Sequence, residues 1–346
     1  MGPPHALTVP SVSPSPSWVD AVLEAGAVPA SSVPDASLGR TDIEEFTGAD
    51  AVEDRELQVH ALAGAPALAP RAVGFLDGIE LWRVEGYSGV TPIVRAHVAA
   101  AIRRRGPDRR LRTVAEAAEE LAITRLDRLS KGVRRALEEH GVRVVEIPAE
   151  DAGQPARAIP AARVVVQKAR AALERRVGER GLDALGPDEW LVVDGVISDS
   201  PALSAHPRTL GVVKSHGAQY FEGAELERAL TLPADHRTGV FCPKSRGARR
   251  EIHSWYLRLW PWEGNDLLYG LVRLEARAHP DTVALAPAVS AWLLRERAPL
   301  ATPDRRWDRL LYAIHDVETY LRTRAPRDLV PPPSSTSRLP VSRIAS

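Results

Sequence analysis

The chain has 346 residues, 44% of them apolar, and its 45 Lys and Arg residues equal its 45 Asp and Glu residues. The length permits one large domain or two ordinary ones, and zero net charge excludes the overall basic excess that is typical of nucleic-acid-binding domains. The single cysteine, Cys242, excludes an internal disulfide framework and a zinc site built from cysteines alone.

The composition also bears on the compartment. No apolar run approaches the ~18 residues that a membrane-spanning helix needs. The first residues, Met1-Gly2-Pro3-Pro4-His5, lack the basic and apolar regions of a secretory signal. A lone cysteine fits a reducing environment. We therefore expect a cytoplasmic protein that makes no contact with a membrane.

Both ends of the chain have compositions that are typical of disorder. Residues 1–38 are rich in Pro, Ser and Ala and are expected to form a disordered arm, in which residues 18–23 are a candidate docking helix. Residues 326–346 contain three consecutive prolines and are expected to form a disordered tail. The folded domain is expected over residues 40–325.

The first part of this domain mixes strand-like and helix-like patterns. The run Phe75-Leu76-Asp77-Gly78 is followed by alternating apolar and charged residues, which predicts a hairpin. Residues 92–105 fit either a strand that leads into a helix or one helix throughout. Apolar residues at a spacing of three or four predict a helix over 113–140, and hence a helical insert at about 108–140.

The second part of the domain predicts further strands and helices. The expected elements are a strand at 142–147, a helix over 157–180, strands at 190–194, 209–214 and 238–241, a hairpin formed by 254–259 and 267–275, and helices over 283–296 and 305–323. This order predicts an α/β fold with a mixed β-sheet flanked by helices.

Two Asp-Gly steps, Asp77-Gly78 and Asp194-Gly195, each follow an apolar run. Each is expected to place a carboxylate where a buried strand emerges, beside a glycine that permits close approach of backbone or ligand. Metal-assisted phosphoryl transfer needs several carboxylates that converge on one or two Mg²⁺ or Mn²⁺ ions. The two aspartates are candidate ligands of this kind, and ordinary strand-to-turn exits are the alternative.

Other candidates lie on the neighbouring elements. The helix over 157–180 carries Glu174 and Glu179, either of which is a third carboxylate ligand or a solvated helix charge. His315 shares a helix face with Leu311 and is a ligand or a core histidine. Lys214 ends a strand, where it contacts a phosphate or lies at the surface.

Two basic segments are candidates for binding nucleic acid. Lys244–Arg250 precedes the aromatic residues Trp255, Tyr256, Trp260 and Trp262, a combination that suits single strands unless the aromatics are core residues. A second basic patch contains Arg103–Arg105, Arg109, Arg110 and Arg112. No glycine-rich phosphate loop, dinucleotide fingerprint or Gly-x-Ser-x-Gly motif is present, which disfavours a nucleotide-hydrolysing motor, a dinucleotide oxidoreductase and an ordinary serine hydrolase.

In this order the motifs resemble those of the NurA family of DNA-end-processing nucleases, which have an RNase H-like fold. The resemblance covers roughly residues 70–322. Its motifs are Phe75-Leu76-Asp77-Gly78-Ile79, Val192-Val193-Asp194-Gly195, Gly211-Val212-Val213-Lys214, Arg273-Leu274-Glu275 and Trp307-Asp308 with Ile314-His315.

The resemblance implies an RNase H-like mixed sheet and a DNA nuclease that depends on Mn²⁺, with Mg²⁺ as the alternative ion. It implies 5′ exonuclease action, endonuclease action on single strands, a homodimer, and docking on a HerA-type hexameric ATPase in DNA repair. Asp77, Asp194 and His315 match motif positions of the metal site, and Glu174 is chosen as the helix glutamate. Lys214 is expected to steady the scissile phosphate.

Two positions depart from the family pattern. Ile79 stands where the family has Ser, and Trp307-Asp308 where it has Tyr-Pro. These departures motivate an alternative function, a non-catalytic adaptor of the same fold that docks on an ATPase ring or on DNA ends. A third hypothesis is an RNase H-like enzyme that acts on RNA.

Overall fold

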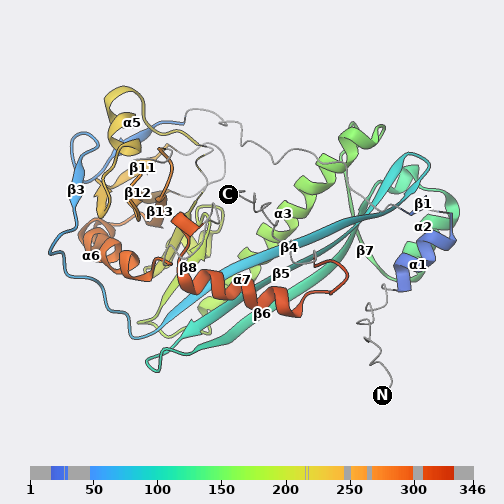
Figure 1. Cartoon of the computed structure of the whole chain (residues 1–346), viewed down its shortest axis with the longest axis horizontal. Helices are drawn as coiled ribbons and strands as arrows, with labels where there is room; N and C mark the ends of the chain where they lie inside the picture. Colours follow the sequence, from blue (N-terminus) through green and yellow to red (C-terminus); the bar gives the residue numbers. More distant parts are fainter. Residues whose placement is uncertain are drawn as a thin grey trace, which may run out of the picture.

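The computed structural model describes residues 17–26, 28–29, 47–214, 216, 218–244, 251–262, 267–298 and 307–330. Over these residues the chain forms one large mixed sheet of 13 strands with helices packed against it (Figure 1). The predicted α/β class with a mixed, helix-flanked sheet is therefore confirmed. No helix in this part of the chain has the length and apolar character needed to cross a membrane.

Three long strands run most of the length of the molecule (Figure 1). They are β4 (Val73–Ser88), β5 (Thr91–Arg105) and β6 (Leu111–Thr124), with 16, 15 and 14 residues. β5 is antiparallel to both neighbours. Helices α1 (Ser17–Glu24) and α2 (Lys131–Glu139) pack on each other at the far end of this ribbon.

The other side of β4 carries shorter strands. β8 (Trp190–Asp194) is parallel to β4, and β9 (Thr209–Val213) is parallel to β8. β13 (Leu271–Arg277) is antiparallel to β9 and forms the predicted hairpin with β12 (Ile252–Arg258). The remaining elements are β1 (Val28–Pro29), β2 (Ala49–Ala51), β3 (Val59–Ala61), β7 (Arg143–Glu146), β10 (His236–Thr238), β11 (Phe241–Pro243), α4 (Pro201–Ala205), α5 (Gly223–Leu230), η1 (Leu126–Arg128) and η2 (Trp307–Arg309).

The two faces of β4 are covered by different helices because side chains alternate across a strand. Phe75 and Ile79 pack in one core cluster with α6 (Pro280–Glu296) and α7 (Tyr312–Arg324), whereas Leu76 packs in another with α3 (Pro155–Leu182). α3 approaches the sheet closely at Gly178, where an added Cβ would lie 2.9 Å from Leu76 Cδ2. A larger residue there would push the helix off the sheet.

Several predicted elements are wrong. The Asp77-Gly78 step is not a hairpin turn, because β4 runs through it without a break. Residues 92–105 are strand throughout, and 111–124 form strand β6, so the helical insert shrinks to α2. The Ala- and Glu-rich sequence of β6 favours a helix locally, but pairing with β5 along its length outweighs this preference.

Smaller differences concern three other elements. The strand expected at 238–241 is divided between β10 and β11, and the helix expected from 305 starts as the short η2 turn before α7. The helix expected at 157–180, the strand at 142–147 and the helix at 283–296 match α3, β7 and α6 to within a few residues.

The segments expected to be disordered are partly held by the fold. Trp18, Val19 and Val22 of α1 are buried in a cluster with Val133 and Leu137 of α2, so the expectation of a disordered arm is wrong for residues 17–24. At the other end, residues 326–330 are held by buried Leu329 and by Asp328. Residues 1–16, 30–46 and 331–346 lie outside the described residues.

Candidate active site

The two Asp-Gly steps lie side by side in the sheet. β4 and β8 are parallel and pair up to Leu76 and Val193, so the next residue on each strand is an aspartate. β8 ends at Asp194, and Gly195 leaves the strand with a φ of 123°, which favours glycine. Asp77 instead lies within β4 and is 5% exposed. Asp194 therefore lies at a strand end, as predicted. Asp77 lies within β4, at the level where the neighbouring strand β8 ends.

Lys214 joins this group from β9, the next strand along. β8 and β9 are parallel, so Asp194 and Lys214 emerge at the same edge of the sheet. The Lys214 Nζ atom lies 2.9 Å from each carboxylate oxygen of Asp194. Arg309, in η2, donates a hydrogen bond to the Lys214 carbonyl at 3.1 Å. The lysine is therefore fixed against Asp194 at its side chain and against η2 at its backbone.

Glu174 reaches the two aspartates from α3, on the other face of the sheet. Its carboxylate occupies the space that a side chain at position 78 would fill, because Glu174 Cγ would lie 2.8 Å from a Cβ added to Gly78. Arg170, one turn earlier, donates to Glu174 Oε1 at 2.9 Å and to the Gly78 carbonyl at 3.4 Å. Glu179 lies elsewhere and accepts a 2.6 Å hydrogen bond from Ser200. Glu174 is thus the helix glutamate that faces the aspartates.

Burial shifts the protonation of these carboxyl groups. Burial raises the pKa of Asp77 well above its usual range, the charges of Asp194 and Glu174 raise it further, and Lys214 opposes the rise. Burial likewise raises the pKa of Glu174 to about 7, with Arg170 opposing and Asp194 and Glu80 adding to the shift. Raised pKa values of neighbouring carboxyl groups mean that their ionised forms lack compensating positive charge.

His315 lies on α7, which covers the face of β4 toward which Asp77 is expected to point by strand alternation. Among Asp77, Glu174, Asp194 and His315, all of them described, no three have ligand atoms that lie within 4.8 Å of one another. A preformed cage for a single ion is therefore not built from these four residues. Two ions about 3.5–4 Å apart draw on a wider set of ligand positions.

The donor chemistry of the group fits a hard divalent cation. Asp and Glu offer carboxylate oxygens, which are the ligands that Mg²⁺ and Mn²⁺ prefer. Four carboxyl groups, those of Asp77, Glu80, Glu174 and Asp194, face three basic side chains, those of Arg163, Arg170 and Lys214. A bound cation would supply the missing positive charge and return the carboxyl pKa values toward their usual range.

Arg170 and Glu80 carried no role in the sequence predictions, and Glu275 entered them only as part of the Arg-x-Glu motif. Arg170 Nε lies 3.4 Å from Glu80 Oε2, so these two residues extend the charged group along α3 and β4. Glu275, 2% exposed, accepts backbone hydrogen bonds from Ile197 at 2.9 Å and Ser198 at 3.3 Å, and thereby fixes the loop that follows Asp194. The Arg-x-Glu motif could single out Glu275, because alternate residues share one face of a strand. No motif of this kind singles out Arg170 among the charged residues of its helix.

A separate group, Glu53, Asp54 and His60, does bring three potential ligand atoms within 4.8 Å. Glu53 accepts two hydrogen bonds from buried Arg237, both at 2.6 Å. Burial opposes ionisation of Glu53, but the Arg237 hydrogen bond and the backbone of Val240 bring its pKa below its usual value. The group is therefore neutralised by an arginine, and no sequence motif marked it.

The predicted basic and aromatic segment is divided. Trp255 is buried and donates a 2.9 Å hydrogen bond to Ser290, and Tyr256 is buried in a neighbouring cluster. These two rings are core residues, which confirms for them the alternative to base stacking. Residues 245–250 of the basic loop lie outside the described residues.

The fold and the site define an α/β protein with a cluster of carboxylate side chains at the point where two parallel strands stop pairing. No protein-family model matches the chain, and no curated protein matches it either.

Proposed function

We propose that the chain is a metal-dependent DNA nuclease of the NurA type with an RNase H-like core. The order of the central strands supports this assignment: three antiparallel strands, β4 to β6, come first, and two parallel strands, β8 and β9, are added on the other side of β4. This arrangement is the one that an RNase H-like fold requires. It also places the motifs that contain Asp77, Asp194 and Lys214 on neighbouring strands.

One observation carries the proposal. Two aspartates from adjacent parallel strands and a glutamate from the covering helix gather at the point where β8 ends, with a lysine from the next strand. Carboxylates with raised pKa values in such a place are candidates for metal ligands rather than for structural ion pairs. A solvated turn would not bury Asp77 or raise its pKa.

The proposed ligands of Mn²⁺, or of Mg²⁺, are Asp77, Glu174, Asp194 and His315. Such an ion, when bound, supplies charge neutralisation and acidifies bound water. Lys214 is the proposed phosphate contact, because its ammonium group lies beside Asp194, one of the proposed metal ligands. Glu275 holds the loop after Asp194, and Gly78 leaves room for Glu174.

The test is cleavage of a labelled single-stranded DNA in Mn²⁺ by the wild-type chain and by an Asp77→Asn/Asp194→Asn double variant. The expected result is loss of at least 100-fold in rate, of the order that removing catalytic groups costs. Asp188→Asn is the matched control, because the Asp188 side chain is 87% exposed. Equal cleavage by wild type and double variant would refute the proposal, and a matched RNA strand separates DNA from RNA as the substrate.

The second candidate function is a non-catalytic adaptor. It is favoured by the Lys214 ammonium, which engages both oxygens of Asp194, and by Ile79, which is 3% exposed in the core where the family has Ser. An adaptor would bind no Mn²⁺ in a calorimetric titration, whereas the nuclease would bind it and lose it in the double variant. A homodimer and a HerA-type hexameric ATPase are the proposed partners of either form.

A further inference from the structure

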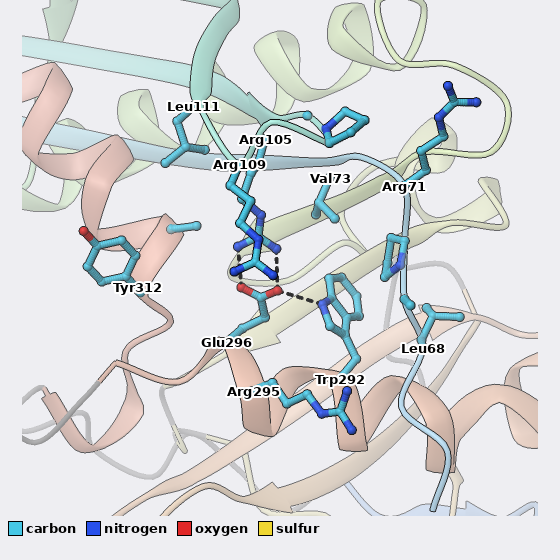
Figure 2. Close-up of a pocket in the computed structure, with 15 residues that line it drawn as sticks. Leu68, Arg71, Val73, Arg105, Arg109, Leu111, Trp292, Arg295, Glu296 and Tyr312 are labelled. Atoms are coloured by element: carbon cyan, nitrogen blue, oxygen red, sulfur yellow. Dashed lines mark hydrogen bonds and ion pairs between the residues drawn. The ribbon is translucent and has the colours of Figure 1, made fainter.

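A cavity of about 560 Å³ is lined by no residue of the carboxylate site (Figure 2). It opens between the start of β4, the end of β5, α6 and the first turn of α7. Its charged lining consists of four arginines and one glutamate: Arg71, Arg105, Arg109, Arg295 and Glu296. A chain with no net charge thus concentrates positive charge at one cavity.

The single glutamate is already engaged. Arg105 donates both of its terminal nitrogens to the Glu296 carboxylate, and Trp292 donates to the same group at 2.8 Å. Figure 2 shows Arg105 and Arg109 extending together toward Glu296. Arg71, Arg109 and Arg295 make no ion pair or side-chain hydrogen bond with any residue that the structure describes. The charge of Arg71 acts on Glu189, and Figure 2 shows its guanidinium group extending away from the other two. The guanidinium groups of Arg109 and Arg295 therefore remain available to an anion.

The backbone places one of these arginines at a conformational cost. Arg109 has a φ of 59°, in a tight turn closed by a 2.9 Å hydrogen bond from its amide to the Gly106 carbonyl. A residue with a β-carbon is disfavoured in this region, where glycine or asparagine is usual. The turn thus holds an arginine where other residues fit the backbone better.

The cavity lies on the face of β4 toward which Asp77 is expected to point, and not on the face that α3 and Glu174 cover. Val73 lines it, and Asp77 is four residues further along the strand with the same alternation, about 13 Å away at ~3.3 Å per residue. Tyr312 and Ala313 of α7 line it as well, just before His315. Phe75, which is fully buried in the core, lies between Val73 and Asp77 on this face, so the cavity is separate from the carboxylate site.

We propose that this cavity binds the phosphate of a nucleotide unit, with Arg109 and Arg295 as its phosphate contacts. Guanidinium groups match phosphate oxygens in pairs, and the volume is in the range of small-molecule sites. Leu68, Val73 and Leu111 provide the apolar wall for the sugar or base. The nucleotide unit belongs to the DNA strand, a claim that rests on the proposed nuclease function, or to a free mononucleotide.

The test measures binding in EDTA, so that no cleavage occurs and the outcome does not depend on catalysis. Fluorescence anisotropy with a labelled single-stranded oligonucleotide compares wild type, Arg109→Ala/Arg295→Ala, and the matched pair Arg134→Ala/Arg135→Ala on the exposed face of α2. Loss of two phosphate contacts is expected to weaken binding about tenfold and to reduce the slope of log affinity against log salt by about 1.4. The control pair should change neither quantity.

The second arm titrates AMP and inorganic pyrophosphate by calorimetry. Loss of their binding in the Arg109→Ala/Arg295→Ala variant, with oligonucleotide binding intact, would identify a free nucleotide as the ligand. An Arg109→Lys/Arg295→Lys variant, which keeps the charge, is expected to restore most of the affinity and the salt slope. If the Arg109→Ala/Arg295→Ala variant melts at the wild-type temperature and binds the oligonucleotide, AMP and pyrophosphate as wild type does, the phosphate site is overturned. DNA cleavage that depends on Asp194 would still support the nuclease proposal in that case.

Discussion

Gly78 and Glu174 share one space between β4 and α3. A Cβ at position 78 would collide with the Glu174 carboxylate and would lie 3.0 Å from the Ala99 carbonyl. The missing side chain lets a glutamate from the helix layer reach the aspartates of the sheet layer. The glycine of the first Asp-Gly step is therefore required for the assembly of the carboxylate group and not for a turn.

The first prediction concerns this contact. Gly78→Ala is expected to lower the free energy of unfolding by about 1–3 kcal/mol, because overpacking displaces Glu174 or bends β4. Urea denaturation measures the change. Gly153→Ala is the control, since a Cβ there meets nothing within 4 Å, and it is expected to shift stability by less than about 0.5 kcal/mol. Equal effects at the two positions would contradict the shared space.

The second prediction concerns pH. The folded pKa of Glu174, about 7, lies above its ordinary value of 4.5, so the folded state binds a proton that the unfolded state releases. The stabilisation is complete below about pH 4.5 and is lost as pH rises through 7. Stability of the metal-free protein is expected to fall by roughly 3 kcal/mol over this window, with Asp77 adding in the same direction. Urea denaturation at a series of pH values measures the fall.

The variants for this pH series are Glu174→Gln and Glu138→Gln. Glu174→Gln is expected to flatten the profile between pH 5 and 7, because the amide does not titrate. Glu138, whose side chain is 60% exposed on α2, should leave the profile unchanged when replaced. A wild-type profile that rises with pH across this window would show that Glu174 is not held in its neutral form.

The third prediction concerns metal binding. Mn²⁺ is expected to raise the melting temperature at pH 8, where Glu174 is ionised and repelled by its neighbours. An ion at 100 times its dissociation constant adds about 2.7 kcal/mol to the folded state. Asp194→Asn is expected to remove most of this gain, while Asp188→Asn keeps it. Thermal unfolding with and without EDTA provides the measurement, and an identical gain in both variants would place the ion elsewhere.

The fourth prediction concerns the C-terminal contact. Asp328 accepts a hydrogen bond from Arg95, whose side chain is 2% exposed, and lies 3.5 Å from an Arg83 nitrogen. Asp328→Asn is expected to cost about 2 kcal/mol, because a buried guanidinium loses one of its charged partners and keeps Glu120. Urea denaturation of a chain truncated after residue 325 should show at least this loss. An unchanged midpoint would mean that residues 326–330 contribute nothing to folding.

Much of the fold follows from local patterns, and the rest depends on contacts between distant segments. α3 and β8 were predictable because their apolar periods and flanking Gly or Pro residues are local signals. β6 was not, because its Ala and Glu residues favour a helix until β5 provides a partner. Asp77 was expected at a strand end, but it lies within β4, whose length the Asp-Gly step concealed.

The candidate site shows the same division. Asp194 and Lys214 each follow a short buried strand, and their contact arises because those strands are parallel neighbours. The choice between Glu174 and Glu179 depended on the rotation of α3 against the sheet, and the space left by Gly78 is filled by Glu174. The roles of Arg170 and Glu80 were hidden, because a charged residue on a surface and one in a buried group look alike in sequence.

The end of β8 at Asp194 has a further consequence for β4. Among the described residues, β4 pairs with no strand on this side between Leu76 and Gly86, so main-chain groups there form an open edge. Open edges invite strands of other chains, and charged side chains discourage such addition. Glu80, Arg83 and Glu85 lie along this stretch, and Arg170 covers the Gly78 carbonyl. The charges beside the candidate site are therefore expected to discourage the addition of a foreign strand along this part of β4.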